Sequence, residues 1–415
     1  MYDFTTLGAI VGLVIAIVLI IKKVSPAYSL ILGALIGGII GGGGLVTTVN
    51  TMVSGASSMM SSVLRIMTSG ILAGALIKTG SAEKIAETIV EKLGEKRALL
   101  AISIATMIIC TVGVFIDISV ITVAPIAIAI GRKVGLTNSS ILLAMIGGGK
   151  AGNILSPNPN TIAASEAFSV DLTAVIMENA IPAVGALIVT VVLSTLLSKK
   201  GNDTIPADEK REKTTLPGFM AAFAGPLVVI ILLALRPLCG ISIDPLIALP
   251  LGGLVCVFVT GNAKDTISIT EFGLSKVIGV SILLIGTGTI AGIIKASALQ
   301  YDVITIIEAM SMPAFVLAPI SGILMAAASA STTAGTTIAS QTFGGTLIAQ
   351  GVPAISAAAM VHAGATVLDS LPHGSFFHAT GGSVRMSIND RMKLIPYEAM
   401  IGLTSTILAI IWYLI

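Results

Sequence analysis

Three charged side chains lie inside apolar stretches of this 415-residue chain. Asp117 belongs to the segment Val-Phe-Ile-Asp-Ile-Ser, Lys150 follows three glycines, and Asp369 precedes the segment Ser-Leu-Pro-His. A charge at the centre of a membrane helix costs ~2.5–3.5 kcal/mol on an insertion scale, so an ionisable residue there indicates a functional site. A carboxyl group removed from water can exchange a proton near neutral pH, and an ionised one can bind Na⁺. We therefore expect Asp117 and Asp369, together with Ser119, to bind a coupling cation.

Lys150 carries a positive charge and is the expected counter-charge of an anionic ligand. The glycines before it let such a ligand approach the backbone closely. An internal ion pair of Lys150 with Asp117 or Asp369 is the alternative. Arg65 is also set among apolar residues. For Arg65 we favour a structural ion pair, or a side chain that extends to the membrane surface.

Four polar segments interrupt the apolar runs, namely residues 113–119, 152–161, 329–337 and 369–375. Irregular backbone at mid-membrane depth must face protein or a water-filled cavity. Prolines free carbonyl groups that can bind Na⁺, and the N-termini of half-helices attract anions. Ordinary kinks and helix-packing contacts are the alternative. The candidate substrate ligands are Lys150, Asn153, Ser156, Asn158, Asn160, Thr161, Ser331, Thr332, Thr333, Ser370 and His373, and Na⁺ could be bound at Asp117, Asn153 and Asp369.

Other classes of site are not indicated by the sequence. The three cysteines show no disulfide or metal spacing, and no His-Glu-x-x-His pattern occurs. The chain has no nucleotide-binding glycine fingerprint and no basic patch with interleaved aromatic residues. We therefore expect no cofactor, no metal centre, no enzymatic activity and no nucleic-acid partner.

The chain contains an internal repeat. The segment at 70–78, Gly-Ile-Leu-Ala-Gly-Ala-Leu-Ile-Lys, recurs at 288–295 with one residue fewer, and residues 135–160 align with residues 351–375. A duplicated membrane sequence whose copies are interrupted by Gly, Pro and polar residues is typical of secondary transporters. We expect a first repeat at 1–197, a cytoplasmic linker at 198–216 and a second repeat at 217–415.

Composition indicates an integral membrane protein. Hydrophobic residues are 55% of the chain and charged residues 11%, and the mean hydropathy is +1.02. Apolar runs long enough to cross a ~30 Å hydrocarbon layer recur along it. We expect apolar segments at 4–21, 26–43, 52–78, 98–131, 138–165, 173–197, 217–236, 243–261, 276–297, 313–349, 353–383 and 397–415, and shorter linkers at 81–96 and 298–311.

The distribution of Lys and Arg suggests how these segments cross the membrane. Residues 98–131 are too long for one span and have basic residues at both ends, so both ends should be cytoplasmic. A re-entrant hairpin satisfies that condition. Each half then has five spans and one hairpin, and an odd number of spans inverts the second half. We predict an all-α integral membrane protein with about ten spans, two re-entrant hairpins, two broken helices and both termini outside.

Several of these motifs resemble the gluconate permease family, part of the ion transporter superfamily of secondary carriers. Val-Phe-Ile-Asp at 114–117 is similar to the family's hairpin motif, and Ser-Pro-Asn-Pro-Asn-Thr at 156–161 to its Pro-rich break. Leu-Asp-Ser-Leu-Pro-His at 368–373 resembles its hydroxybutyrate permease branch, and Ala-Ser-Thr-Thr-Ala at 330–334 its second hairpin. The resemblance implies a homodimer whose protomers have a scaffold domain and a moving, elevator-type transport domain. It also implies uptake of a small hydroxycarboxylate, commonly with H⁺.

The chain departs from the family pattern in ways that bear on substrate and ion. Asp117 stands where gluconate permeases typically have Glu, Asn158 replaces a His, and Asn160-Thr161 replaces Gly-Pro. These changes resemble the Ser-Asn-Thr ion sites of the dicarboxylate branch, so Na⁺ coupling stays open beside H⁺.

The functional hypothesis from the sequence is a symporter in the inner (plasma) membrane for a small organic anion such as gluconate or hydroxybutyrate. A Na⁺-coupled di- or tricarboxylate carrier and an anion exchanger are the nearest alternatives. An ion channel is a more distant alternative, because the inverted repeat argues against it. An intramembrane hydrolase is also distant, because only Asp117, Asp369 and a serine with His373 suggest such a site.

Overall fold

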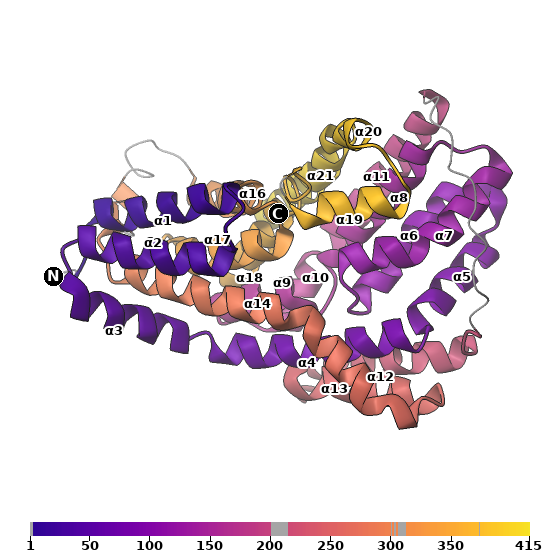
Figure 1. The fold of residues 1–415 in the computed structure, drawn as a ribbon, viewed down its shortest axis with the longest axis horizontal. Coiled ribbons are helices and arrows are strands. Elements are labelled where there is room, and N and C mark those ends of the chain that lie inside the picture. Colours follow the sequence, from indigo (N-terminus) through magenta and orange to yellow (C-terminus); the bar gives the residue numbers. More distant parts are fainter. Residues whose placement is uncertain (1–2, 201–214, 300, 303, 306–312, 373) are drawn as a thin grey trace.

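The computed structural model describes residues 3–200, 215–299, 301–302, 304–305, 313–372 and 374–415, without the side chains of residues 199, 200 and 237. These residues form helices joined by short turns, with no β-strand among them; an isolated bridge pairs Phe4 with Ser297. Figure 1 shows an elongated body in which the first helices lie at one end. The all-helical class predicted from the sequence is confirmed for the described part of the chain.

The helices of the second half follow in the same order as those of the first, except that α14 takes the place of α3 and α4. Between α14 and α16, residues 300, 303 and 306–312 lie outside the described part of the chain. The first half contains α1 Thr6–Ile21, α2 Pro26–Ile40, α3 Gly44–Ser57, α4 Met60–Lys78, α5 Ser81–Leu93, α6 Ala98–Thr111, α7 Ile116–Val134, α8 Asn138–Asn153, α9 Pro159–Ala167, α10 Leu172–Glu178 and α11 Ala180–Lys200. The second half contains α12 Phe219–Cys239, α13 Pro245–Val259, α14 Thr266–Lys295, α16 Leu317–Ser329, α17 Thr332–Ala349, α18 Ala354–Ala365, α19 Ser375–Ser383, α20 Ile388–Met392 and α21 Ile395–Leu414.

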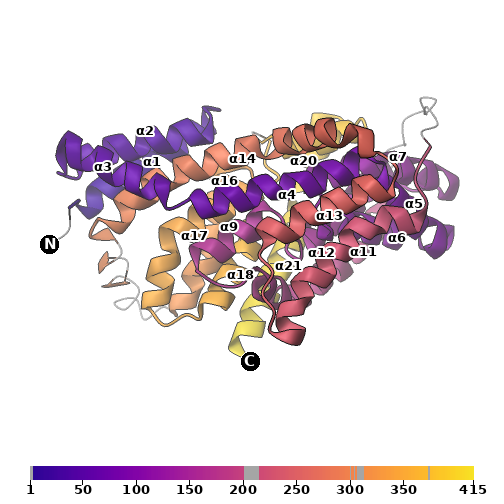
Figure 2. The same cartoon turned by 90° about the horizontal axis from the view of Figure 1, so that it is seen from below.

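The repeated glycine motif has a packing role. In both views α14 runs alongside α3 and α4, which it contacts (Figure 1, Figure 2). A Cβ atom added to Gly55 would lie 2.2 Å from the carbonyl oxygen of Gly288, and one added to Gly273 would lie 2.1 Å from that of Gly70. Small residues at such crossings allow helix backbones to approach closely in a membrane protein. The glycines therefore hold α3, α4 and α14 together as one wall.

The two predicted hairpins are present as helix pairs. α6 and α7 are joined at residues 112–115, where Gly113 has a φ of +107°, and α16 and α17 at residues 330–331, where Ala330 has a φ of +46°. α6 has 14 residues and α16 has 13, so each is about 20 Å long at a rise of ~1.5 Å per residue. Neither could cross a ~30 Å hydrocarbon layer alone.

The predicted breaks are also present. α8 ends at Asn153 and α9 begins at Pro159, while α18 ends at Ala365 and α19 begins at Ser375. Within the second break, His373 lies outside the described residues. A buried ion pair of Arg391 with Glu398 fastens the segment after α19 to α21.

Some segment boundaries differ from expectation. The segment expected at 52–78 is divided into α3 and α4, and α14 begins at Thr266 rather than near 276. Five described helical segments are long and apolar enough to cross a membrane, and five further apolar helices have 10–17 residues. The number of ten spans therefore stays a prediction.

The close helix contact predicts a clear difference between two glycines of α14. Gly273→Ala should lower the thermal midpoint in detergent, because the added methyl group meets the backbone of α4, and such overpacking costs ~1–3 kcal/mol. Gly279→Ala is the control, since a methyl group added there would meet no atom within 4 Å. Equal thermal midpoints for the two variants would contradict this account of the wall.

Candidate functional site

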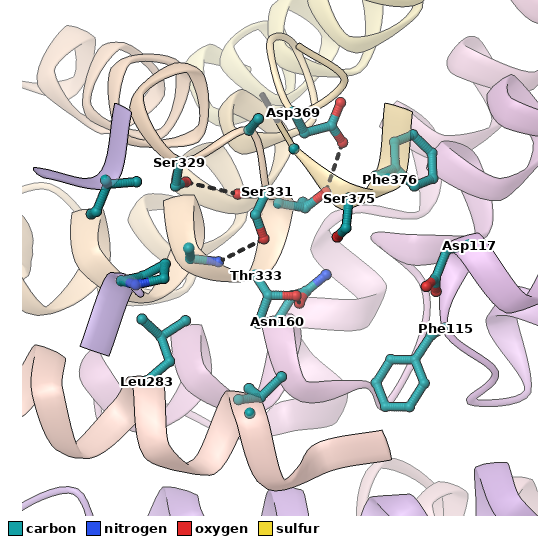
Figure 3. Close-up of a pocket in the computed structure, with 18 of the residues that line it drawn as sticks. Phe115, Asp117, Asn160, Leu283, Ser329, Ser331, Thr333, Asp369, Ser375 and Phe376 are labelled. Atoms are coloured by element: carbon teal, nitrogen blue, oxygen red, sulfur yellow. Dashed lines mark hydrogen bonds between the residues drawn. The ribbon is translucent and has the colours of Figure 1, made fainter. Parts of the chain in front are cut away.

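A cavity of about 720 Å³ lies where the two hairpin tips and the two breaks meet. Its opposite side is formed by α14 and by the turn between α1 and α2, including Lys276 and Lys23. Figure 3 shows side chains from both halves around it, among them Asp117, Asn160, Ser331 and Asp369. Segments more than 200 positions apart in the sequence thus form one site, since residue 117 and residue 369 both line it.

Asparagine side chains stabilise the first break. The side-chain carbonyl of Asn158 accepts hydrogen bonds from the backbone amides of Asn160 at 2.9 Å and Thr161 at 3.2 Å, which caps α9. Its Nδ2 donates to the carbonyl of Asn153 at 2.9 Å and to the Oδ1 of Asn153 at 2.5 Å. The Asn153 carbonyl and the first amides of α9 therefore already have partners within the protein.

A hydrogen bond between Thr333 and Asn160 joins the two halves at the cavity. Thr333 Oγ1 donates to Asn160 Oδ1 at 2.5 Å, while Asn160 Nδ2 donates to Asn153 Oδ1 at 3.0 Å. The Nδ2 of Asn153 is buried and has no acceptor among the described residues. Asn153 also lines the cavity.

Three helices begin at the cavity. The first residues of α7, α17 and α19 line it, and the residues before them (Phe115, Ser331 and Gly374) line it as well. Within the described part of the chain, the amides of Thr332 and Thr333 at the start of α17 have no acceptor. A helix N-terminus carries a partial positive charge and free N–H groups, both of which favour an anion.

The two aspartates have different surroundings. Asp117 is partly exposed to the cavity in the first turn of α7. Asp369 is buried, accepts from Lys150 Nζ at 2.5 Å and Thr332 Oγ1 at 2.7 Å, and is also bonded by Ser370. The carboxylate of Asp369 is therefore neutralised internally, whereas that of Asp117 faces the cavity.

The structure brings most predicted site residues together but turns several away from the cavity. Lys150 does not line it and instead makes the ion pair considered as the alternative from sequence. Ser119 bonds its own helix through the Phe115 carbonyl, and Thr161 bonds the Ser156 carbonyl. The predicted residues that line the cavity are Asp117, Asn153, Asn158, Asn160, Ser331, Thr332, Thr333 and Asp369, those that do not are Ser119, Lys150, Ser156, Thr161 and Ser370, and His373 lies outside the described residues.

Lys23 and Lys276 were missed by the sequence reasoning. Both side chains are exposed and line the cavity, so they add positive charge near the helix N-termini. Their positions after α1 and within α14 resemble ordinary interface lysines in the sequence. Only the folded structure shows that both lysines lie at the cavity formed by the hairpin tips.

A second, smaller cavity of about 250 Å³ contains an ionic network. Arg65 of α4 contacts Glu166 of α9 at 3.0 Å and Asp244, the N-cap of α13, at 2.6 Å. Arg236 contacts Asp171 at 2.5 Å. Arg65 therefore has the structural ion pair favoured from the sequence, and the network links α4 and α13 to the segment after the first break.

The family model of GntP family permeases matches residues 4–415. The chain belongs to the GntP permease family. The resemblance found in the sequence motifs is thereby confirmed, and the GntP family match together with the apolar helices identifies a membrane transporter.

One relative of this GntP permease is similar over nearly the whole chain, and another is similar over about a third of it. A Haemophilus influenzae protein described as an uncharacterized transporter is 53% identical over 410 residues, which cover 99% of this chain and 98% of that protein. The gluconate permease of Bacillus subtilis is 27% identical over 154 residues, or 37% of this chain and 34% of that protein. The crystal structure of the Alcanivorax borkumensis YdaH transporter, reported to have an unusual topology, has a TM-score of 0.61 at 15% identity over 89% of this chain and 88% of that chain. This last similarity concerns the fold alone.

The link between Thr333 and Asn160 predicts unequal effects of two threonine substitutions on α17. Thr333→Val should lower the stability of the purified protein by about 0.5–1.5 kcal/mol, because Asn160 Oδ1 loses its donor. Thr342→Val should leave stability unchanged or raise it, since the hydroxyl of Thr342 is buried without a partner among the described residues. Thermal unfolding of both variants tests this, and a destabilised Thr342→Val beside an unaffected Thr333→Val would refute it.

Proposed function

We propose that this protein is a secondary active transporter that couples uptake of a small organic anion to a cation. The substrate class is a hydroxycarboxylate such as gluconate or hydroxybutyrate, held in the 720 Å³ cavity. The observation that carries the proposal is the meeting of three helix N-termini and the carboxylate of Asp117 at a single cavity lined by both halves. The gluconate permease relatives support the substrate class.

The substrate carboxylate binds at the start of α17 in this proposal. The amides of Thr332 and Thr333 supply two donors, the Nδ2 of Asn153 supplies a third, and α19 adds its positive N-terminus. Hydroxyl groups of the substrate are bound by Ser331 and Asn160, which line the same space. Lys23 and Lys276 attract the anion electrostatically into the cavity.

The coupling cation binds at Asp117. Its carboxylate faces the cavity and, among the described residues, has no ion pair of the kind that Lys150 makes with Asp369. H⁺ is the ion implied by the family, and Na⁺ is the alternative suggested by the neighbouring Asn153 and Asn158. One net positive charge moved inward per cycle gains ~2.3 kcal/mol per 100 mV of membrane potential.

Movement occurs by an elevator mechanism in this proposal. Residues 1–197 and 217–415 are repeats of opposite orientation, and the hairpins and broken helices of both form the transport domain. α1–α4 and α12–α14 form the scaffold, held together by the glycine contacts. A homodimer in the inner membrane, with both termini outside and the cavity open to the cytoplasm, completes the proposal.

The Arg65 network lies between the two proposed domains. α4 and α13 belong to the scaffold, whereas Glu166 is on α9 of the transport domain. Displacement of the transport domain would separate Arg65 from Glu166 but leave its bond to Asp244 intact. The network therefore favours the conformation described here.

Transport in proteoliposomes tests the coupling role of Asp117. The wild-type protein should accumulate a labelled hydroxycarboxylate when a pH or Na⁺ gradient is imposed. Asp117→Asn should lose gradient-driven accumulation and retain exchange of labelled for unlabelled substrate, because the anion site remains. The control is Asp265→Asn, which changes an exposed acid before α14. Accumulation by Asp117→Asn equal to that of the wild type would contradict the assignment, and failure of every gradient would favour an exchanger.

The ionic network predicts a shift in cavity access. In a Cys239→Ser background, Ser375→Cys reports on the cavity, because Ser375 is exposed and lines it. Adding Arg65→Gln should reduce its labelling by a membrane-impermeant maleimide from the cytoplasmic side by about two- to five-fold, as expected for exposed ion pairs of ~0.5–1 kcal/mol.

Lys84→Gln is the matched control for this labelling experiment, since its ion pair with Glu87 lies within one helix. An unchanged or faster labelling rate in Arg65→Gln would show that the network does not favour the open cavity.

A further inference from the structure

Hydrogen-bond donors surround the carboxylate of Asp369. Lys150 Nζ lies 2.5 Å from Asp369 Oδ1 and 2.5 Å from the carbonyl oxygen of Thr366. Ser370 Oγ donates to Oδ1 at 2.9 Å and Thr332 Oγ1 to Oδ2 at 2.7 Å. The side chains of Lys150 and Asp369 are only 1% and 2% exposed. Lys150 Nζ is thus held by a carboxylate and a backbone carbonyl.

This set of oxygen atoms is chemically a cation site. Hard cations are bound in proteins by carboxylate and carbonyl oxygens, with hydroxyl groups nearby. The carbonyl belongs to Thr366, the C-cap of α18, and a helix C-terminus carries a partial negative charge. Gly402 of α21 packs on this carbonyl, and a Cβ atom there would lie 2.5 Å from it, so a side chain at this position would displace the carbonyl. Lys150 Nζ occupies the place where a free cation would bind.

The two halves differ at matching positions. α8 and α18 begin three residues after Gly135 and Gly351, so Lys150 corresponds to Thr366 and Asn153 to Asp369. The first half therefore has a neutral amide where the second half has a carboxylate. The ammonium group that pairs with Asp369 belongs to Lys150 of the first half. Lys150 matches Thr366 in the repeat and also contacts the carbonyl of Thr366.

The hairpin tips show the reverse difference. Asp117 is the second residue of α7, and Thr333 is the second residue of α17. Each half thus has one acid, at the tip in the first half and at the break in the second. Of these two acids, the one at the break is paired with a lysine, and the one at the tip faces the cavity.

We propose that the ammonium group of Lys150 is a tethered cation that permanently fills a cation site built around Asp369. A mobile ion therefore binds only at the Asp117 side of the cavity. This inference rests on the proposed function for its consequence, which is that one coupling cation rather than two moves with each substrate. It also assigns Lys150 to cation replacement rather than to substrate binding.

Removal of the tether tests the inference without any transport measurement. Lys150→Ala is purified in detergent at mildly alkaline pH and unfolded thermally in choline chloride, sodium chloride or propylammonium chloride. Propylammonium has the chain length that the substitution removes. In choline the thermal midpoint should fall by roughly 5 °C or more, because a buried carboxylate loses its partner. Na⁺ or propylammonium should restore most of that loss, while the wild type should not distinguish the three salts.

Two further variants make the result decisive. Lys150→Ala/Asp369→Asn lacks both charges and should fold equally well in every salt. Lys276→Ala removes an exposed lysine of the same cavity and should show the wild-type response. The inference is overturned if Lys150→Ala is equally stable in all three salts. It is also overturned if Lys150→Ala folds in none of the three salts while the double variant folds. A cation response of the double variant would overturn it as well.

These outcomes are independent of the proposed function. A missing cation response in Lys150→Ala would not argue against coupling at Asp117. Failure of hydroxycarboxylate uptake would not argue against a cation site at Asp369. A charge-to-substrate ratio measured afterwards in proteoliposomes should be higher by one cation in Lys150→Ala than in the wild type.

Discussion

The satisfaction of backbone polar groups at the helix breaks is the constraint on which this structure depends. Peptide groups inside a membrane have little water to bond, so a helix can end there only where the protein itself supplies partners. At the first break these partners are amides: Asn158 caps α9 and also bonds the last residue of α8. Asn160 then bonds Thr333 of the other half. The bonds that allow the helix to end also connect the first break to the second hairpin at the cavity.

The rigidity of the opposite wall has a different origin. Where α14 meets α3 and α4, the described residues make close backbone contacts through Gly55, Gly70 and Gly273. In lipid, close packing replaces the hydrophobic driving force that acts in water. In the proposed carrier, a wall held by many short contacts keeps its shape while the hydrogen-bonded side changes position. The two kinds of contact suit the two domains of the proposed carrier.

The sequence predicted the elements better than the contacts between them. The hairpins, both breaks, the helical class and the family all follow from Gly, Pro and acidic residues set in apolar runs. The side chains that face the cavity could not be predicted in the same way. Thr161 and Ser119 bond their own backbone, which is a local competition that composition does not reveal. Lys150 finds its partner in the second break, and the sequence allowed this ion pair only as an alternative to substrate binding.

Arg65 also makes the energy difference between conformations sensitive to the surrounding solution. Its side chain is 24% exposed and that of Glu166 is 25% exposed, so dissolved ions reach the contact. Electrostatic attraction between accessible charges declines over a Debye length of ~10 Å at 0.1 M ionic strength and ~3 Å at 1 M. In the proposed carrier, a medium of low ionic strength should therefore hold the molecule more firmly in the conformation described here than a medium of high ionic strength does. The salt content of the surroundings then becomes a determinant of how readily the proposed carrier reorients.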